Sequence, residues 1–352
     1  MKRIVCIFLI LSVFTHVNLF AQETDTLETI VVEENQEAEL AYNTGIKLLQ
    51  KKQYDDAIAE FKKAIQFKPD FLKAYLNMGA AHTYAGNLRS AVLAYNKSLQ
   101  IDSTFAQAYY SRGLLYYSQK QYSQSISDFT AAEINGYKTP ELYYYLGVSY
   151  FFKKNYKDAI DAYTKAIAFN PAYAFAYNDR GSARRMIGDM DAAILDYQKA
   201  VQIMPKFAAA YDNLGMAYYL NGNYKKAVES YDLAIKWKND FHIAYNNRGE
   251  AKYALEDIQG AFKDYQKALQ LKPDYAYAYN NLGILYAKQN RFDDAVKMYS
   301  KAIELNPELG IAFFNRGAAY EMMKKFDEAC LEWVEAKKHG VDVPAAYISG
   351  CN

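Results

Sequence analysis

The sequence is poor in residues that break helices and in residues that form common reaction centres. Of its 352 residues only seven are proline, three are cysteine and four are histidine. Scarce proline, together with abundant helix-forming residues, favours an all-α chain. We find no phosphate-binding loop, no zinc-ligand spacing and no nucleophile elbow. His82, His242 and His339 are isolated from one another, so we expect no enzyme, no cofactor and no metal site.

An excess of charge of one sign is also lacking. The chain has 41 lysines and arginines against 40 aspartates and glutamates. This balance gives no electrostatic basis for binding nucleic acid or an anionic membrane. What the chain does have is aromatic and apolar residues, including 35 tyrosines. Such a composition can bury a large core, which argues against disorder over the whole chain.

The first 21 residues have the pattern of an export signal. Two basic residues precede the apolar run IVCIFLILSVF, and Ala21 supplies a small residue for cleavage. The alternative is an uncleaved membrane anchor, but polar residues between Thr15 and Asn18 leave the run short for a span. Cleavage leaves 39 basic against 40 acidic side chains, and no later apolar run follows. We therefore expect a soluble protein of the periplasm or cell exterior, in a Gram-negative envelope. Residues 22–37 are acidic and show no helical period, which predicts a flexible leader.

A fixed period of 34 residues organises the chain from Ala38 to Val343. We number the positions of each period from Ala38, so that a glycine stands at position 8 in every period. Alanine or serine stands at position 20, an aromatic residue at position 24 and a small residue at position 27. A constant period of this length indicates a stack of helical repeats. The glycines are Gly45, Gly79, Gly113, Gly147, Gly181, Gly215, Gly249, Gly283 and Gly317.

This pattern resembles the tetratricopeptide repeat in its length and at each of these positions. The resemblance implies nine units, each a helix, a turn and a second helix, stacked into a right-handed superhelical solenoid. Small residues at positions 8 and 20 are expected to let the two helices approach closely. The units start at residues 38, 72, 106, 140, 174, 208, 242, 276 and 310, and residues 344–352 form a C-terminal cap or tail.

Arginine at position 7 alternates with apolar residues from the second unit onward. Every unit with this arginine has an acid at position 23, and the intervening units have neither charge. We infer partly buried ion pairs between the two helices of one unit, because a buried guanidinium needs a carboxylate partner. The alternative is that these charges form ligand or catalytic sites. The predicted pairs are Arg112/Asp128, Arg180/Asp196, Arg248/Asp264 and Arg316/Glu332.

In the resembling family the first helices line a concave groove. Positions 2, 5, 9 and 12 share one face by helical spacing. We expect this face to expose aromatic residues in the first half of the chain and amides in the second, and to bind an extended peptide or partner protein. The alternative is that Tyr117 and Phe151 only pack on one another. The candidate residues are Tyr110, Tyr117, Tyr144, Phe151, Asn178, Arg185, Asn246, Asn247, Asn280 and Asn281.

Cys330 and Cys351 are the two cysteines outside the predicted signal. In an exported protein they can form a disulfide that fastens the tail over the last unit, with Pro344 in the first turn of a short helix. The alternative is two free thiols.

Together these patterns predict a non-catalytic protein–protein interaction scaffold of the cell envelope. The alternative function is the binding of a glycan or another small ligand in the aromatic half of the groove. Self-association through the open ends of the stack is a further alternative.

Overall fold

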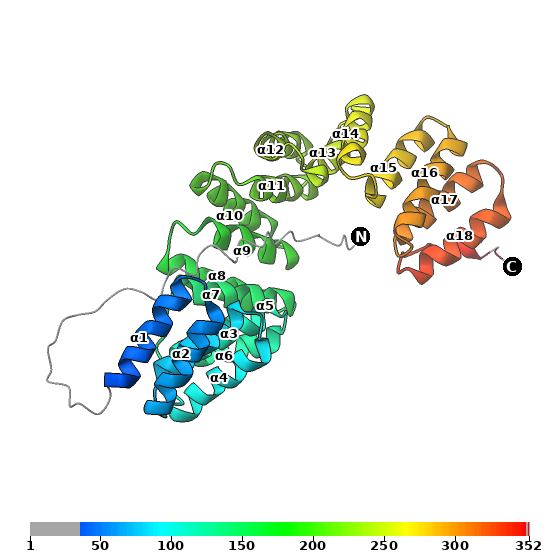
Figure 1. The fold of residues 1–352 in the computed structure, drawn as a ribbon. Coiled ribbons are helices and arrows are strands. Elements are labelled where there is room, and N and C mark those ends of the chain that lie inside the picture. Colours follow the sequence, from blue (N-terminus) through cyan, green and yellow to red (C-terminus); the bar gives the residue numbers. More distant parts are fainter. Residues whose placement is uncertain (1–35, 350, 352) are drawn as a thin grey trace. The chain divides into compact units, whose positions relative to one another are not determined.

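The computed structural model describes residues 36–349 and 351 of the chain. Within this part every regular element is a helix and no strand occurs (Figure 1). The predicted export signal and residues 22–35 of the predicted leader lie outside the described residues. The first helix begins at Gln36, so the predicted leader ends two residues too late. Glu37 and Glu39 lie in the first turn of this helix, where negative charge is favoured by the helix dipole.

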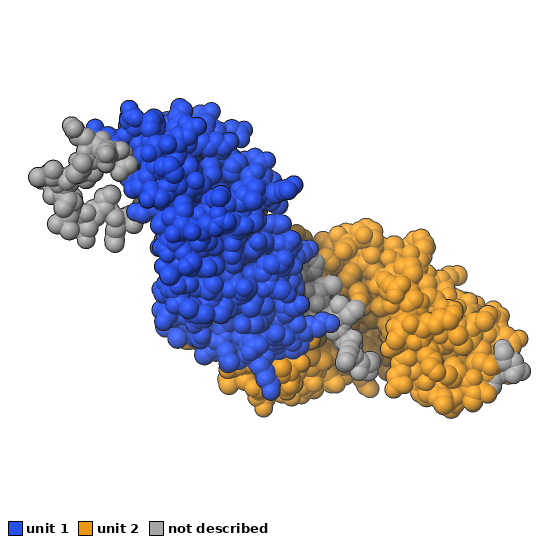
Figure 2. All heavy atoms as spheres, turned by 90° about the horizontal axis from the view of Figure 1, so that it is seen from below, with its two compact units in different colours: residues 1–183 blue, residues 184–352 orange. Residues whose placement is uncertain are grey.

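The chain forms two compact units, residues 1–183 and 184–352, shown in blue and orange in Figure 2. The boundary falls in the last turn of α9 (Ala174–Met186). The first unit also contains α1 (Gln36–Gln50), α2 (Tyr54–Phe67), α3 (Leu72–Tyr84), α4 (Leu88–Ile101), α5 (Ala106–Ser118), α6 (Tyr122–Ile134), α7 (Pro140–Phe152) and α8 (Tyr156–Phe169). The second unit contains α10 (Met190–Ile203), α11 (Ala208–Leu220), α12 (Tyr224–Trp237), α13 (His242–Ala254), α14 (Ile258–Leu271), α15 (Ala276–Lys288), α16 (Phe292–Leu305), α17 (Gly310–Met322), α18 (Phe326–Lys338) and α19 (Ala345–Ile348).

Consecutive helices pack as pairs joined by short turns within each unit (Figure 1). In the first unit α1 packs against α2, and α2 in turn packs against the first helix of the next pair, α3. First helices of neighbouring pairs also contact each other, as α11 does with α13 and α13 with α15 in the second unit. Among the described helices, second helices make no comparable contact with one another. The first helices therefore lie on the inner side of each unit.

The close contact within a pair depends on the glycine at position 8. A Cβ atom on Gly283 would lie 2.5 Å from Cε1 of Tyr299, the position-24 ring of the facing helix. Tyr299 is itself buried, so its ring has no room to move away. In both units the corresponding distance from a Cβ atom at position 8 to the ring at position 24 is 2.5–2.8 Å, including that from Gly317 to Trp333 in the last repeat. The sequence suggested the small residue at position 20 as the partner, whereas the ring at position 24 is the group that excludes a side chain at position 8.

Two predicted arginine–carboxylate pairs join the helices of one repeat through two hydrogen bonds each. In the first, Nη2 and Nε of Arg112 donate to Oδ1 and Oδ2 of Asp128 over 2.7 and 2.8 Å. In the second, the same atoms of Arg248 donate to Asp264 over 2.6 and 2.9 Å. The carboxylates are buried, so these bonds replace the water that the charges lose.

The other two predicted pairs differ from this geometry. Arg316 reaches Glu332 through a single bond of 2.6 Å, and its Nε and the Oε2 of Glu332 are buried without a partner among the described residues. Arg180 and Asp196 belong to different units, so their pairing remains a prediction. Within the second unit Asp196 pairs with Arg184 at 2.9 Å, a contact that the sequence analysis missed.

Each of these arginines also reaches the preceding repeat, which the sequence analysis did not anticipate. Nη1 donates to a side-chain oxygen at position 25 of the preceding second helix. Arg112, Arg248 and Arg316 therefore each join the two helices of their own repeat to the second helix of the preceding repeat. Arg180 also bonds the preceding repeat. The acceptors are Asn96 for Arg112, Thr164 for Arg180, Asp232 for Arg248 and Ser300 for Arg316.

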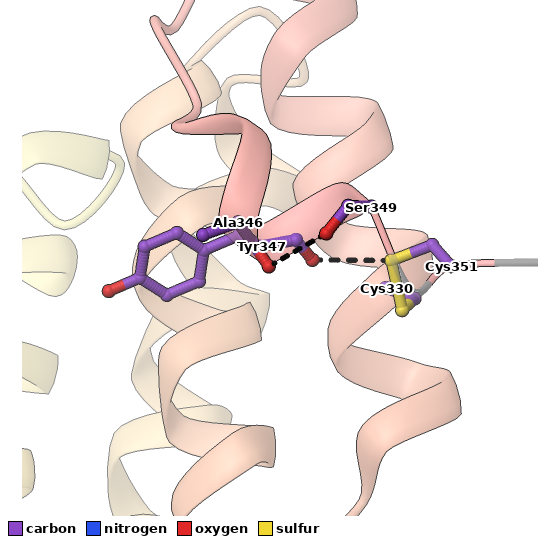
Figure 3. Close-up of a disulfide and its surroundings, with 5 residues drawn as sticks. All are labelled: Cys330, Ala346, Tyr347, Ser349 and Cys351. Atoms are coloured by element: carbon purple, nitrogen blue, oxygen red, sulfur yellow. Dashed lines mark hydrogen bonds between the residues drawn. A yellow bond between two sulfur atoms is a disulfide. The ribbon is translucent and has the colours of Figure 1, made fainter.

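A disulfide joins the end of the chain to the last long helix. Cys330 on α18 is bonded to Cys351, 21 residues further along the chain (Figure 3). Between them Pro344 precedes the short helix α19, and the Tyr347 ring packs edge-on against Trp333 with ring centres 4.6 Å apart. This segment covers part of the last repeat, which has no following repeat to pack against in the described chain.

We expect the substitution Asp128→Ala to lower the free energy of unfolding by about 3 kcal/mol, because it leaves the guanidinium of Arg112 without its charged partner. Adding Arg112→Leu should recover at least half of this loss, since Leu146 and Ala162 occupy the same two positions in the next repeat. Urea unfolding of the wild type and both variants measures the two values. A double variant as unstable as Asp128→Ala would show that the pair does not act as a unit.

Candidate functional site

A series of hydrogen bonds runs between neighbouring first helices in the second unit. Each bond joins position 6 of one repeat to position 5 of the repeat before it. We call this series the 5–6 ladder, and each of its bonds is donated by an asparagine Nδ2. Its members are Asn247 to Asp212 at 3.1 Å, Asn281 to Asn246 at 3.0 Å and Asn315 to Asn280 at 2.9 Å.

The 5–6 ladder corrects the predicted role of four amides. Asn246, Asn247, Asn280 and Asn281 were expected to line the groove and to bond a peptide backbone, but all four are buried. Helical spacing placed Asn246 and Asn280 on the groove face, with Asn247 and Asn281 beside them at position 6. It did not show that the next first helix lies against these residues. Asn281 bonds Asn246 and Asn280, while Asn247 bonds Asp212. Glu250 accepts further bonds from Asn246 and Asn281 at 3.3 and 3.1 Å.

One rung of the ladder holds a titratable group. Asp212 accepts the bond from Asn247, and removal of its carboxyl from water raises its pKa to about 7. The bond from Asn247 and the positive charge of Arg185 both oppose this rise. Arg185, a predicted groove residue, is only partly exposed, and its Nε is buried without a partner among the described residues. Burial of the Asp212 carboxyl therefore favours its protonated form.

The predicted aromatic half of the groove is also buried. Tyr110, Tyr144 and Phe151 were expected to be exposed, and that expectation is wrong. They belong to one apolar cluster of the first unit, where the Tyr110 ring stacks on Tyr137 with centres 4.5 Å apart. The rings that contact them come from other parts of the same repeat, such as Tyr163 on the second helix for Tyr144, and helical spacing within one helix does not show those rings.

Tyr117 is partly buried at the edge of the same cluster. Its ring centre lies 5.1 Å from that of Tyr145, while the Phe151 ring lies 5.3 Å from Tyr156. Both rings thus serve packing, as the alternative supposed, but the described contacts are with these tyrosines and not between Tyr117 and Phe151.

Asn178 and Tyr144 both bond a second, partly buried carboxyl. The Tyr144 hydroxyl donates to Oδ2 of Asp179 at 2.8 Å, and Asn178 Nδ2 donates to Oδ1 at 2.9 Å. Burial raises the pKa of Asp179 to about 6 in spite of both bonds. These contacts use the polar groups of Asn178 and Tyr144 inside the first unit.

An open depression of about 430 Å³ remains on the inner side of the second unit. It lies where position 12 is Ala287, whereas the preceding two repeats have Tyr219 and Tyr253 there. We call it the Ala287 depression. Its lining residues come from α13, α15, α16 and α17 and the turn before α16: Tyr253, Ile284, Ala287, Lys288, Asn290, Phe292, Tyr299, Asn315, Ala318, Ala319 and Met322.

The Ala287 depression combines apolar walls with a polar rim. Met322 is 62% exposed, although it is a large apolar side chain. Lys288 lies over the ring of Tyr253, with Nζ 5.3 Å from the ring centre, and provides a positive charge at the rim. Alanine in place of tyrosine at position 12 was visible in the sequence. That this change leaves a depression depends on how the repeats stack.

A second depression of about 300 Å³ lies between α14 and α15. Its arginine, Arg291, is engaged in internal contacts, since it lies over the Tyr286 ring at 4.4 Å and bonds Asp294 at 2.6 Å. This depression is therefore a weaker candidate than the Ala287 depression.

The described residues also bear on metal binding and on membrane crossing. Among them, no three His, Cys, Asp or Glu side chains are placed to hold a metal ion. None of the described helices combines the length and the apolar character that crossing a bilayer requires.

Models of the tetratricopeptide repeat match the sequence over much of its length. The matches cover residues 140–173, 208–241 and 276–309, and a model described as TPR repeat matches residues 45–83, 81–120, 181–222 and 249–290. Together they include more than half of the chain. The chain belongs to the tetratricopeptide repeat family.

Solved structures show the same fold. The Cut9–Hcn1 hetero-tetramer of the APC/C matches with a TM-score of 0.58 at 15% identity, over 89% of this chain and 75% of that one. A tetratricopeptide repeat protein from Parabacteroides merdae matches with a TM-score of 0.51 at 19% identity, over 71% of this chain and 99% of that one. YrrB, a TPR protein with an unusual peptide-binding site, is 28% identical over 52% of this chain and 95% of its own, with a TM-score of 0.49. No curated protein matches the sequence.

The pKa of Asp212 leads to a pH-dependent prediction. A folded-state pKa near 7, above the ordinary value of 3.8, means that the folded protein binds more protons than the unfolded chain between these values. Stability should therefore fall as pH rises from about 4 to about 7. We expect Asp212→Asn to raise the free energy of unfolding at pH 8 by about 1–2 kcal/mol, because its oxygen still accepts from Asn247 and carries no charge.

Thermal unfolding of the wild type and Asp212→Asn at pH 5 and pH 8 measures this effect. The converse change Asn280→Asp, at the same position of a later rung, is the matched control and should destabilise at pH 8. An Asp212→Asn variant with the wild-type dependence on pH would contradict the assignment.

Proposed function

We propose that this tetratricopeptide repeat protein is a non-catalytic scaffold that binds an extended segment of a partner protein at the Ala287 depression. The observation that carries the proposal is this depression, which remains open in the second unit. In the same unit the polar side chains of the 5–6 ladder are already bonded to one another. The 5–6 ladder uses the amides of positions 5 and 6 internally, so a partner has few polar groups to reach elsewhere on that face.

The lining of the depression favours an apolar side chain as the anchor of the bound segment. Tyr253, Ile284 and Met322 line it with large, mainly apolar side chains, and Ala287 and Ala318 add small apolar ones. An apolar side chain that fills it removes exposed apolar surface, including that of Met322, from water. The open form of the depression suits a chain that passes over it and inserts one residue.

The rim favours a negative group beside that anchor. Lys288 provides a positive charge, and the amide of Asn290 can bond both donors and acceptors of an extended backbone. The proposed ligand is thus a peptide with an apolar residue next to an aspartate, a glutamate or a terminal carboxylate.

A second candidate function is the binding of a glycan or another small ligand. The volume of about 430 Å³ supports it, since small-molecule pockets commonly measure about 300–1,000 Å³. The same depression serves both candidates, so one substitution tests both.

We also propose that the protein is exported to the cell envelope. The basic and apolar pattern of residues 1–21 supports export. The Cys330–Cys351 disulfide is compatible with an oxidising compartment.

The substitution Ala287→Tyr should abolish partner capture without unfolding the protein. It fills the depression with the residue that Tyr219 and Tyr253 already place at position 12 of the two preceding repeats. Cross-linking pull-downs from the cell envelope, with the wild type and the variant as baits, measure capture. Thr83→Tyr changes the same position in the first unit and serves as the matched control, and circular dichroism checks the fold of each bait.

A protein captured by the wild type and Thr83→Tyr, but not by Ala287→Tyr, supports the proposed site. A protein captured equally by all three would contradict it. Saturable glycan binding in calorimetry that Ala287→Tyr removes, with no protein captured by any bait, would favour the second candidate function.

A further inference from the structure

The last long helix carries an exposed stripe that differs from the other helices. Asp327, Leu331, Val334 and Lys338 stand four, three and four residues apart on α18, so they lie along one face. All four are exposed, and Leu331 and Val334 are 69% and 40% accessible. We call this set the α18 stripe. It presents acid, apolar, apolar and basic residues in that order.

No other second helix has this order at the same positions. Positions 18, 22, 25 and 29 read Asp191, Leu195, Gln198 and Gln202 on α10, and Lys225, Glu229, Asp232 and Lys236 on α12. Position 25 of α4, α8, α12 and α16 accepts a hydrogen bond from the arginine of the following repeat. On α18 this position is Val334, which accepts no such bond and is suited to an apolar contact.

The α18 stripe is complementary to itself when reversed. The midpoint between Asp327 and Lys338 coincides with the midpoint between Leu331 and Val334. A two-fold axis through that point places Asp327 of one chain opposite Lys338 of the other, and Leu331 opposite Val334. Glu328 and Lys337, both exposed, share the same midpoint and add a flanking pair of opposite charges. Such an isologous contact is the commonest form of symmetric dimer.

We propose that two copies of this chain pair antiparallel along the α18 stripe. The stripe is accessible because the disulfide-bonded end of the chain packs on another side of α18. The ring of Tyr347 contacts Trp333, and Val343 is buried in the same cluster. Among the described residues Lys338 pairs with Glu335, three residues before it, in an exposed pair of the kind that contributes little to stability.

The contact is small, which sets its expected strength. Each helix of 13 residues is only about 20 Å long. Contact along one such pair of helices buries less area than the roughly 1,200–2,000 Å² of stable standard interfaces. We therefore expect a reversible dimer that forms at micromolar concentrations and weakens as salt screens the two end pairs.

Sedimentation velocity of the full exported chain over about 1–200 µM is the first test, and the wild type should pass from monomer to dimer in this range. Leu331→Glu should raise the dissociation constant at least about tenfold, because it places a charge in the apolar centre of the contact. Leu195→Glu on α10 is the matched control, since Leu195 occupies the same position and is 65% exposed. It should leave the dissociation constant unchanged. A wild type that stays monomeric, or equal effects of the two variants, would overturn the proposal.

Charge reversal tests the antiparallel arrangement itself. Asp327→Lys and Lys338→Asp should each weaken the homodimer at least about tenfold, because each places like charges opposite one another at both ends. A mixture of the two variants should form a heterodimer of about wild-type strength, since both end pairs are then again of opposite sign. Failure of the mixture to associate more strongly than either variant alone would overturn the antiparallel pairing.

Discussion

The contact between the glycine at position 8 and the ring at position 24 determines how the rest of this structure can form. A ring carbon lies where a Cβ atom would be, as Tyr299 does at Gly283. The two helices of a repeat can therefore come together only if position 8 has no side chain. Once they do, the ring is buried between them, and the arginine at position 7 meets the acid at position 23. Local packing thus sets the geometry that the longer-range contacts use.

Polar groups then join one repeat to the next in two different ways. On the inner side the 5–6 ladder connects first helices through amides and one carboxylate, Asp212. Elsewhere, arginines such as Arg112 and Arg248 also bond the second helix of the preceding repeat. Both arrangements satisfy groups that would be costly to bury alone. They also remove these groups from the surface available to a partner, so that binding depends on departures from the repeat pattern. The Ala287 depression and the α18 stripe are two such departures.

The sequence alone predicted the features that follow from the 34-residue period and from charges that occur together in one repeat. The helical class and the partners Asp128, Asp264 and Glu332 could be read from spacing and from paired occurrence, because both members of each pair belong to one repeat. Burial of Tyr144 and Asn281 could not, since spacing within one helix shows which residues share a face and not which neighbour covers it. The acceptor Asn96 lies in another repeat than its arginine. The Ala287 depression likewise depends on how three first helices are placed in space.

The most direct test of the central contact is a double-mutant cycle on Gly283 and Tyr299, measured as free energies of unfolding in urea. Replacement of an unhindered glycine in a helix by alanine stabilises a protein by about 1 kcal/mol. We expect Gly283→Ala instead to lose at least about 2 kcal/mol in the wild type, because the new Cβ atom overlaps a buried ring. In the background of Tyr299→Ala the same change should cost little or stabilise the protein. Stabilisation by Gly283→Ala in the wild type, or an equal loss in both backgrounds, would contradict the account.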